Sequence, residues 1–242
     1  MDTMTQSGAY VTSSFYRFSG WKDRWKAFQD MGARQLDAQG QPPLFSRHMG
    51  SGAGEGFSMM PDWSTYHYFA VWPDEATARA HLQGLHYVPS WSSNAKEAAH
   101  LLLHCIQSHG YWDQQQPFAA AEDRHPEAPL AVLTRASVRW NKLHRFWQYV
   151  PKSSRAIEQA EGVLFSKGVG EWPLIQQATI SIWENEAKLK SFAYKDTIHK
   201  KIVALTRKEN WYSEDLFARF RVIDTFGHYK GIPLSEKINP AQ

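Results

Sequence analysis

The chain has 242 residues, which suit one large domain or two domains of about 100–120 residues each. Hydrophobic residues make up 43% and charged residues 21%, as in folded globular proteins, so a disordered or collagen-like chain is excluded. The formal net charge is only +3, and no basic run is long enough for an arm that binds nucleic acid. The single cysteine, Cys105, excludes an intramolecular disulfide and any four-cysteine metal site held by this chain alone, and it fits a reducing compartment.

The sequence predicts a soluble cytoplasmic protein. No apolar run approaches the roughly 20 residues that a transmembrane helix needs. Residues 1–6 lack the basic and then apolar layout of a signal peptide. Residues 1–121 carry 8 basic and 10 acidic side chains, whereas residues 122–242 carry 19 and 14. The basic second half suits an anionic surface or an acidic partner protein.

The aromatic content is unusual, with 11 Trp, 10 Tyr and 13 Phe in the chain. Aromatic side chains bury a large area each, so this content favours a heavily packed core. A core that also lines a pocket for a large flat ligand or a polyene is the alternative.

Five short segments of the first half recur in the second half in the same order. Their offset falls steadily from 122 to 100 residues, which indicates longer loops in the first copy. We therefore predict a tandem duplication into repeats 1–121 and 122–242, with the seam in the polar stretch 119–129. The matched pairs are Arg17-Phe18 with Arg139-Trp140, Leu44–Ser46 with Leu164–Ser166, Gly52–Glu55 with Gly168–Glu171, Val71–Ala76 with Ile182–Ala187, and Tyr111-Trp112 with Trp211-Tyr212.

The second repeat shows the clearer order of elements. In its strand 177–183, Ile180 and Ile182 share one face, and Asn185 is the expected N-cap of the next helix, as Asp74 is in the first repeat. The order is the β-α-β-β-α-β plan of a ferredoxin-like fold with one extra helix. We therefore predict an α+β protein in which two such repeats pair their sheets into a barrel-like body with ligand room under the helices. The expected elements are strand 130–138, helix 141–150, strand 163–168, strand 177–183, helix 185–194, helix 197–208 and strand 216–223.

Other features have plain structural interpretations. The glycine-rich segment 50–56 is expected to be a bend between strands rather than a phosphate loop, because no Gly-Lys-Ser/Thr ending follows it. Glu55 and Glu171 occupy equivalent places in the two repeats, which favours a structural role at the seam. Residues 84–128 are expected to form a loop and a helix, on which His100 and His104 share one face as a surface or interface pair.

Several motifs in order resemble the spheroidene monooxygenase family, over residues 13–230. Each motif is short, and their order and spacing carry the resemblance. They are Gly50–Phe57, Phe69–Asp74, Leu133–Ala136, His144–Trp147, Gly168–Glu171, Ser181–Trp183, Phe192–Tyr194 with His199, and Trp211–Phe220.

The resemblance implies a dimeric α+β barrel that binds haem. It implies oxidation of an acyclic carotenoid at C-2 to a ketone, with dioxygen and an electron donor such as reduced ferredoxin. Because this substrate resides in membranes, peripheral contact with the inner membrane surface is also expected. Two alternatives stay open at this point: another reaction on the same scaffold, by a cofactor-free oxygenase or a haem dehydratase, and a non-catalytic haem- or carotenoid-binding protein.

An oxygen-activating haem needs one protein donor to the iron and an open opposite side. His199 is the first choice, because Ile202 and Val203 follow it at helical spacing on an apolar face. His144 is a weaker candidate, and Cys105 is expected to be an inert buried thiol. Arg207 and Arg219 are candidate propionate partners, with Arg219 and Arg221 on one face of the last strand. The residues implied around the haem are His199, Arg207, Arg219, Trp183, Trp211 and Phe192.

Overall fold

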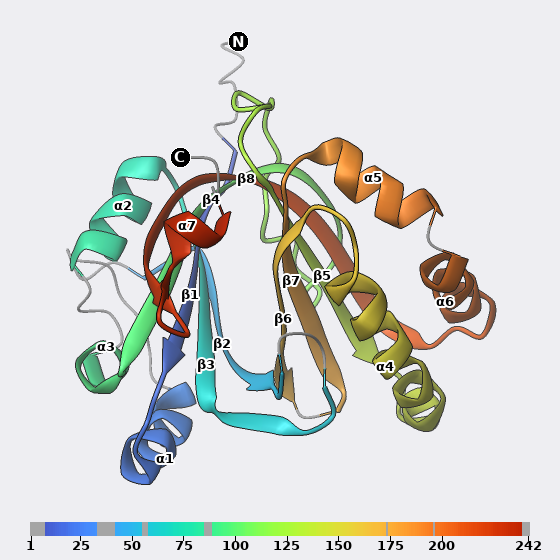
Figure 1. Ribbon diagram of the computed structural model, residues 1–242, viewed down its shortest axis with the longest axis horizontal. Coiled ribbons are helices and arrows are strands. Elements are labelled where there is room, and N and C mark those ends of the chain that lie inside the picture. Colours follow the sequence, from blue (N-terminus) through green and yellow to red (C-terminus); the bar gives the residue numbers. More distant parts are fainter. Residues whose placement is uncertain are drawn as a thin grey trace.

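Eight antiparallel strands close into one barrel in the computed structural model, which describes residues 8–32, 42–54, 58–84, 89–172, 174–195 and 197–238 (Figure 1). The strand order is β4-β1-β3-β2-β6-β7-β5-β8, and β8 pairs back onto β4. The strands are β1 (Tyr10–Arg17), β2 (Phe45–Gly52), β3 (Pro61–Trp72), β4 (Glu97–Gly110), β5 (Leu130–Val138), β6 (Val163–Trp172), β7 (Gln176–Trp183) and β8 (Tyr212–Tyr229), with a short β9 (Ile232–Pro233) beside β8.

Each half of the barrel has the same strand order. The first half reads β4-β1-β3-β2 and the second β8-β5-β7-β6, which is the predicted ferredoxin-like order. The halves meet at a short seam, where Gly50 pairs with Gly170 in β2 and β6, and at the long β4–β8 seam. The barrel therefore closes within one chain, while the tandem duplication and the dimer stay predictions.

Helices cover the outside of the barrel in two separate layers. Figure 1 shows one layer on each flank of the barrel, α1 to α3 over the first half and α4 to α6 over the second. The predicted caps are confirmed, because Asp74 accepts a hydrogen bond from the N–H of Thr77 and Asn185 from that of Lys188. The helices are α1 (Trp21–Gln29), α2 (Glu75–Gly84), α3 (Pro89–Asn94), α4 (Leu143–Glu158), α5 (Glu186–Lys195), α6 (Thr197–Lys208) and α7 (Leu234–Ile238), with short 3-10 turns η1 (Asp30–Gly32) and η2 (Trp140–Lys142).

The barrel interior is one large hydrophobic cluster. Alternate residues of β8, from Leu216 to Val222, point into it, as the alternation in the sequence predicts. Leu234 and Ile238 of α7 join the same cluster, so this helix covers one end of the barrel. Cys105 is fully buried here, as expected, and burial raises the pKa of its thiol to about 12.

The buried hydrophobic clusters under the two helical layers differ in size. Under α1 to α3, 11 buried residues form a cluster that includes Trp72 and Trp91. Under α4 to α6, the corresponding cluster of described residues has four buried members, among them Trp183 and Leu189, and Trp147, Val150 and Trp211 are buried on this side as well.

The glycine-rich segment bends between β2 and β3, as expected. Gly54 has a positive φ of 82°, and a Cβ on Gly52 would lie 2.9 Å from the carbonyl oxygen of Ser58. The buried Nζ of Lys167 donates to the carbonyl oxygens of Gly52 and Gly54 at 2.8 and 2.7 Å. Lys167 of the second half thereby holds this bend of the first half in place.

The prediction for residues 84–128 is wrong where it placed a helix with a histidine pair. His100 and His104 lie in strand β4, not on a helix, and both are buried rather than at the surface. Residues four apart share a face in a strand as well as in a helix, so the spacing alone does not distinguish the two. His100 bonds Ser14 at 2.8 Å, and the ring of His104 packs 4.7 Å from that of Tyr10.

Buried histidines make the stability of the fold depend on pH. Burial lowers the pKa of His67 to about 3 and that of His100 to about 4, from 6.5. Below pH 6.5 the unfolded chain therefore binds protons that the folded chain does not, so the free energy of unfolding falls as pH drops from 6.5 towards 4. Each ring contributes about 1.4 kcal/mol per pH unit once it is fully protonated in the unfolded chain.

The free energy of unfolding of His67→Gln should fall less steeply with pH below 6.5 than that of the wild type. We expect its slope to be smaller by about 1.4 kcal/mol per pH unit, the contribution of one buried histidine. Urea unfolding at several pH values between 6.5 and 4 measures the slope. The matched control is His144→Gln, because His144 is exposed. Equal pH slopes of the unfolding free energy in wild type and His67→Gln would contradict the lowered pKa of His67.

Candidate functional site

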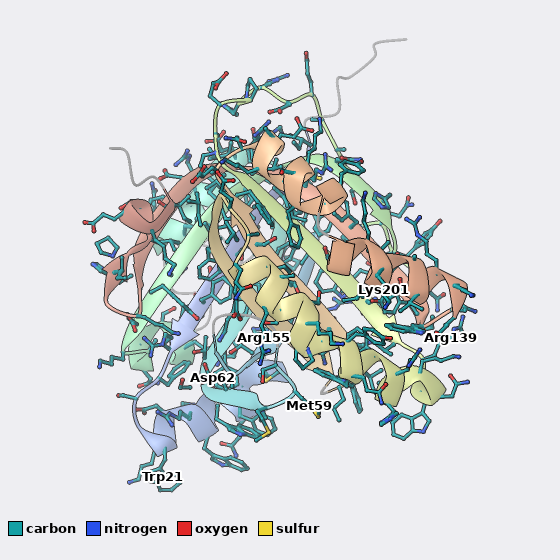
Figure 2. All side chains as sticks on the ribbon, turned by 45° about the vertical axis from the view of Figure 1, so that its right-hand side comes forward. Trp21, Met59, Asp62, Arg139, Arg155 and Lys201 are labelled. Atoms are coloured by element: carbon teal, nitrogen blue, oxygen red, sulfur yellow. The ribbon has the colours of Figure 1, made fainter. Side chains whose placement is uncertain are left out.

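A cavity of about 740 Å³ lies among α4, α5 and α6, in the outer helical layer of the second half. Its volume is in the range of small-molecule and cofactor sites. Figure 2 shows two of its lining residues, Arg155 on α4 and Lys201 on α6. The lining residues are Tyr149, Lys152, Arg155, Ala156, Gln159, Ala160, Glu161, Lys188, Ser191, Phe192, Lys201 and Ile202.

The rim of the cavity is positively charged. Four cations line it against one acid, Glu161, which pairs with Lys188. Lys152, Arg155 and Lys201 have no ion pair with any residue in the described part of the chain. Such cations attract an anionic group, and an arginine binds a carboxylate in a bidentate fashion.

Two pairs of packed aromatic rings contribute to the cavity walls. Phe192 lines the cavity, and the ring of Trp183 lies behind it with a centroid distance of 5.1 Å. Tyr149 of α4 also lines the cavity, and the ring of Trp211 packs against it at a centroid distance of 5.6 Å. Both tryptophans are fully buried, and each indole N–H is bonded, to the Oγ of Ser181 or the carboxylate of Glu209. They therefore support the wall rings rather than line the cavity themselves.

The structure places His199 in α6, one turn before the cavity residue Ile202. The side chain of His199 lies outside the described residues. Arg207 is exposed in the last turn of the same helix, and neither it nor Arg219 is among the residues that line the cavity.

The arginine face of β8 is engaged in contacts within the protein. Arg219 lies 3.4 Å from Glu186 of α5, with its guanidinium over the ring of Phe217. Arg221 is buried, and it donates to Asp123 and to the carbonyl oxygen of Ala128. The pairing of Arg221 with Asp123 ties the connection before β5 to the last strand.

Sequence reasoning missed the cations of α4. It predicted a helix over residues 141–150 only. The helix instead continues through Pro151 to Glu158, and Lys152 and Arg155 lie in this extension. Its apolar residues on the 3.6-residue period, such as Val150 and Ile157, were the available signal for a longer helix.

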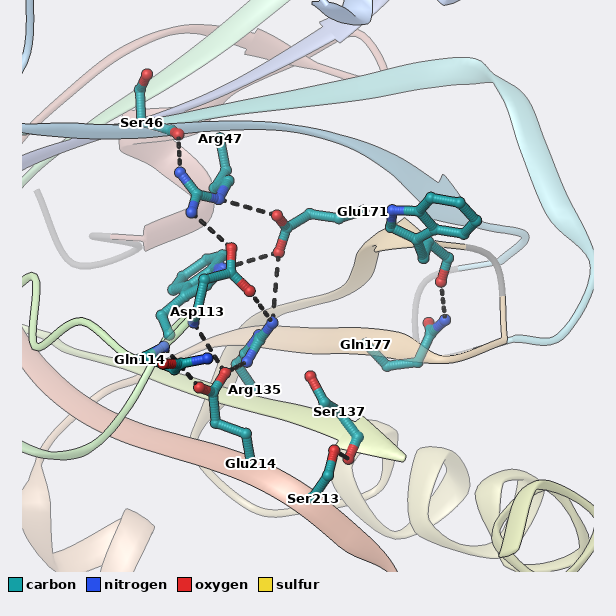
Figure 3. A network of polar contacts seen from close by, with 12 residues as sticks. Ser46, Arg47, Asp113, Gln114, Arg135, Ser137, Glu171, Gln177, Ser213 and Glu214 are labelled. Carbon is teal, nitrogen blue, oxygen red and sulfur yellow. Dashed lines mark hydrogen bonds and ion pairs between the residues drawn. The ribbon is translucent and has the colours of Figure 1, made fainter. Parts of the chain in front are cut away.

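A second polar cluster closes the end of the barrel where β2 begins (Figure 3). Arg135 of β5 is almost fully buried, and it pairs with Glu214 of β8 and with Asp113 at 3.2 Å. Arg47 of β2 contacts Asp113 at 2.6 Å and Glu171 at 2.9 Å. The cluster therefore joins both halves, and its Glu171 fits the structural role expected at the seam, whereas Glu55 lies outside the described residues.

The backbone of the turn after β4 completes this cluster. Asp113 and Gln114 have positive φ angles of 51° and 62°, and both N–H groups donate to the carboxylate of Glu214. Burial alone would raise the pKa of Glu214, but these N–H groups and Arg135 lower it below its usual value. Burial raises the pKa of Glu171, against the opposing hydrogen bond from the indole of Trp112.

Within the described ranges, no three His, Cys, Asp or Glu side chains gather as a metal site, and no helix is long and apolar enough to span a bilayer. Fold and site together define an α+β barrel of two ferredoxin-like sheets, with a basic cavity between the helices of its second outer layer. Two solved aldoxime dehydratase structures share this fold. Their TM-scores are 0.60 and 0.56, at 9% and 11% identity, over 91% and 92% of this chain and 81% and 83% of theirs.

No protein-family model matches the chain. Three curated proteins are similar to the chain in sequence, and each is named spheroidene monooxygenase. The protein from Cereibacter sphaeroides is 36% identical over 91% of this chain and 69% of its own length. Those from Rhodobacter capsulatus and Rubrivivax gelatinosus are 34% and 31% identical, over 93% and 80% of this chain and 95% and 75% of theirs. The chain belongs to the spheroidene monooxygenase family and is an enzyme, which confirms the resemblance of its motifs.

Proposed function

We propose that the protein oxidises an acyclic carotenoid of the spheroidene type at C-2 to a ketone, with dioxygen, a bound haem and an electron donor such as reduced ferredoxin. The observation that carries this proposal is the identity of 34–36% with two spheroidene monooxygenases over more than nine-tenths of the chain. Two hydroxylations of the same carbon, followed by loss of water, leave a ketone.

Two features of the cavity among α4 to α6 support the proposal that it holds the haem. Its walls include the flat rings of Tyr149 and Phe192, and its rim carries cations that suit the two propionates. In this proposal His199 donates to the iron, and Lys152, Arg155 and Lys201 take the propionate role that the sequence assigned to Arg207 and Arg219. When bound, the haem supplies the oxygen activation that side chains alone cannot perform.

The protein's own contribution is to position the substrate. A polyene hydrocarbon offers almost no hydrogen-bonding groups, so apolar and aromatic walls must hold it by shape. Selection of C-2 among similar carbons then depends on how deep the chain enters, because position in the site decides which carbon reacts. Phe192, supported by Trp183, is a rigid surface for such contact.

An absorption spectrum of the purified protein, oxidised and then reduced under carbon monoxide, tests the haem. We expect a Soret band that shifts with carbon monoxide, and conversion of spheroidene-type carotenoids when dioxygen and a reductant are supplied. A strongly red-shifted carbon monoxide band would instead favour thiolate ligation by Cys105.

Other outcomes would support the alternatives. Turnover without any Soret band after haem is added back would indicate a cofactor-free oxygenase. Haem with dehydration activity and no oxygenation would indicate a dehydratase, the activity named for the two solved structures of this fold. Haem or carotenoid binding without turnover would indicate a binding protein.

A further inference from the structure

Helix α1 directs its aromatic side chains away from the protein. Only Ala27 of its nine residues is buried. Trp21, Trp25 and Phe28 are 73%, 54% and 42% exposed. Surface helices normally bury such residues against the core, so this exposure calls for a partner.

The exposed aromatic surface continues onto the start of β3. The ring of Phe28 lies 5.6 Å from Trp25 and 5.6 Å from Trp63, which is 53% exposed. Met59 and Met60, just before β3, are 54% and 69% exposed. Figure 2 shows Trp21 and Met59 along the same lower edge of the molecule, and Figure 1 shows α1 and the start of β3 at that edge. We name this surface the aromatic rim: Trp21, Trp25, Phe28, Met59, Met60 and Trp63.

Cations alternate with the tryptophans of the rim. Lys22 and Lys26 are exposed and directly follow Trp21 and Trp25. Lys26 has a weak ion pair with Asp30 at 3.3 Å, and Lys22 has none among the described residues. Tryptophan beside lysine is the composition of helices that lie at a membrane surface, where rings enter the headgroup layer and cations contact anionic lipids. The cores of protein–protein interfaces are instead depleted in lysine.

We propose that the aromatic rim docks the protein on an anionic lipid bilayer, with the indole rings of α1 in the headgroup layer. The occupant is the lipid surface, because the rim combines exposed rings with positive charge complementary to anionic headgroups. The inference goes beyond the proposed reaction, since lipid binding by the rim needs neither haem nor carotenoid. For an enzyme that acts on a membrane-dissolved substrate, docking brings the barrel to its substrate.

Flotation of the full-length protein with vesicles tests the rim. Vesicles of phosphatidylcholine and phosphatidylglycerol at about 7:3 are compared with phosphatidylcholine alone. We expect Trp21→Ala with Trp25→Ala to lower the partition coefficient by about tenfold or more. Lys22→Glu with Lys26→Glu should lower binding to the anionic vesicles only, and added salt should do the same to wild type. The matched control is Tyr194→Ala, because Tyr194 is equally exposed but lies on α5.

Three results would overturn the proposal. The first is unchanged vesicle binding by the double tryptophan variant. The second is an equal loss of vesicle binding in Tyr194→Ala. The third is a wild type that does not bind vesicles and instead self-associates through the rim. Unchanged far-ultraviolet circular dichroism and Tm confirm that the variants fold. Turnover of detergent-dissolved carotenoid should be the same in the double variant and wild type, so a failure of the proposed reaction is distinguishable from a failure of docking.

Discussion

Arg135→Met is expected to lower the free energy of unfolding by about 3–5 kcal/mol. The guanidinium of Arg135 is 1% exposed, and it faces the carboxylates of Glu214, Asp113 and Glu171. Its removal leaves three carboxylates at the barrel end with only Arg47 beside them. An uncompensated buried charge costs far more than a surface ion pair is worth, which makes this one of the largest effects that a single substitution should have here.

The matched control is Arg139→Met, because Arg139 is exposed four residues further along the chain. It should change the free energy of unfolding by less than about 0.5 kcal/mol. Urea unfolding at pH 7 measures both. The loss of unfolding free energy caused by Arg135→Met should become smaller as pH falls towards about 4. Carboxyl groups that are protonated carry no charge for the guanidinium to compensate. A loss below about 1 kcal/mol at pH 7 would show that the cluster is not the buried charge network described above.

This barrel-end cluster also shows what sequence reasoning could not reach. Its five charged members, Arg47, Asp113, Arg135, Glu171 and Glu214, come from four strands and one turn, far apart in the chain. No local period or spacing connects them, because the closure of the barrel alone brings them together. Only the pairing of segments 52–55 and 168–171 hinted at a seam near Glu171.

Local patterns predicted the elements that depend on local physics. Asp74 and Asn185 cap their helices as expected, because an N-cap is a contact between residues three apart. Strand β7 keeps Ile180 and Ile182 on the interior face, because alternation is enforced by the pleat. The ferredoxin-like strand order followed from the order of these elements.

The failures have equally local causes. Helix α4 passes through Pro151, although proline usually interrupts a helix, and this continuation carries the cavity cations Lys152 and Arg155. Strand β4 was missed because its run of apolar and histidine residues has no period that separates a buried strand from a helix. Of the two rings that line the cavity, Phe192 lies in a family motif, as do Trp183 and Trp211 behind the walls, whereas Tyr149 was not predicted.

His199→Ala is expected to abolish haem binding, with at least a tenfold loss of Soret absorbance per chain and no detectable carotenoid oxidation. In the proposed site His199 would be the one protein donor to the iron, so its loss would leave the haem held only by contacts to its ring and propionates. His199 lies one helical turn before Ile202, which lines the cavity. The matched control is His144→Ala, because His144 is an exposed histidine of α4 bonded to Gln148 at 2.8 Å.

Rescue by added imidazole distinguishes the loss of an iron ligand from the loss of the fold. Imidazole added to His199→Ala should restore part of the Soret band if the side chain donated to the iron, because free imidazole can occupy the space that the substitution leaves. An equal Tm of the haem-free wild type and variant would show that the helical layer is intact. Full haem occupancy in His199→Ala with an unchanged band would remove this residue from the iron. The donor would then have to be another residue of the chain, and the position of the carbon monoxide band would distinguish Cys105 from the remaining histidines.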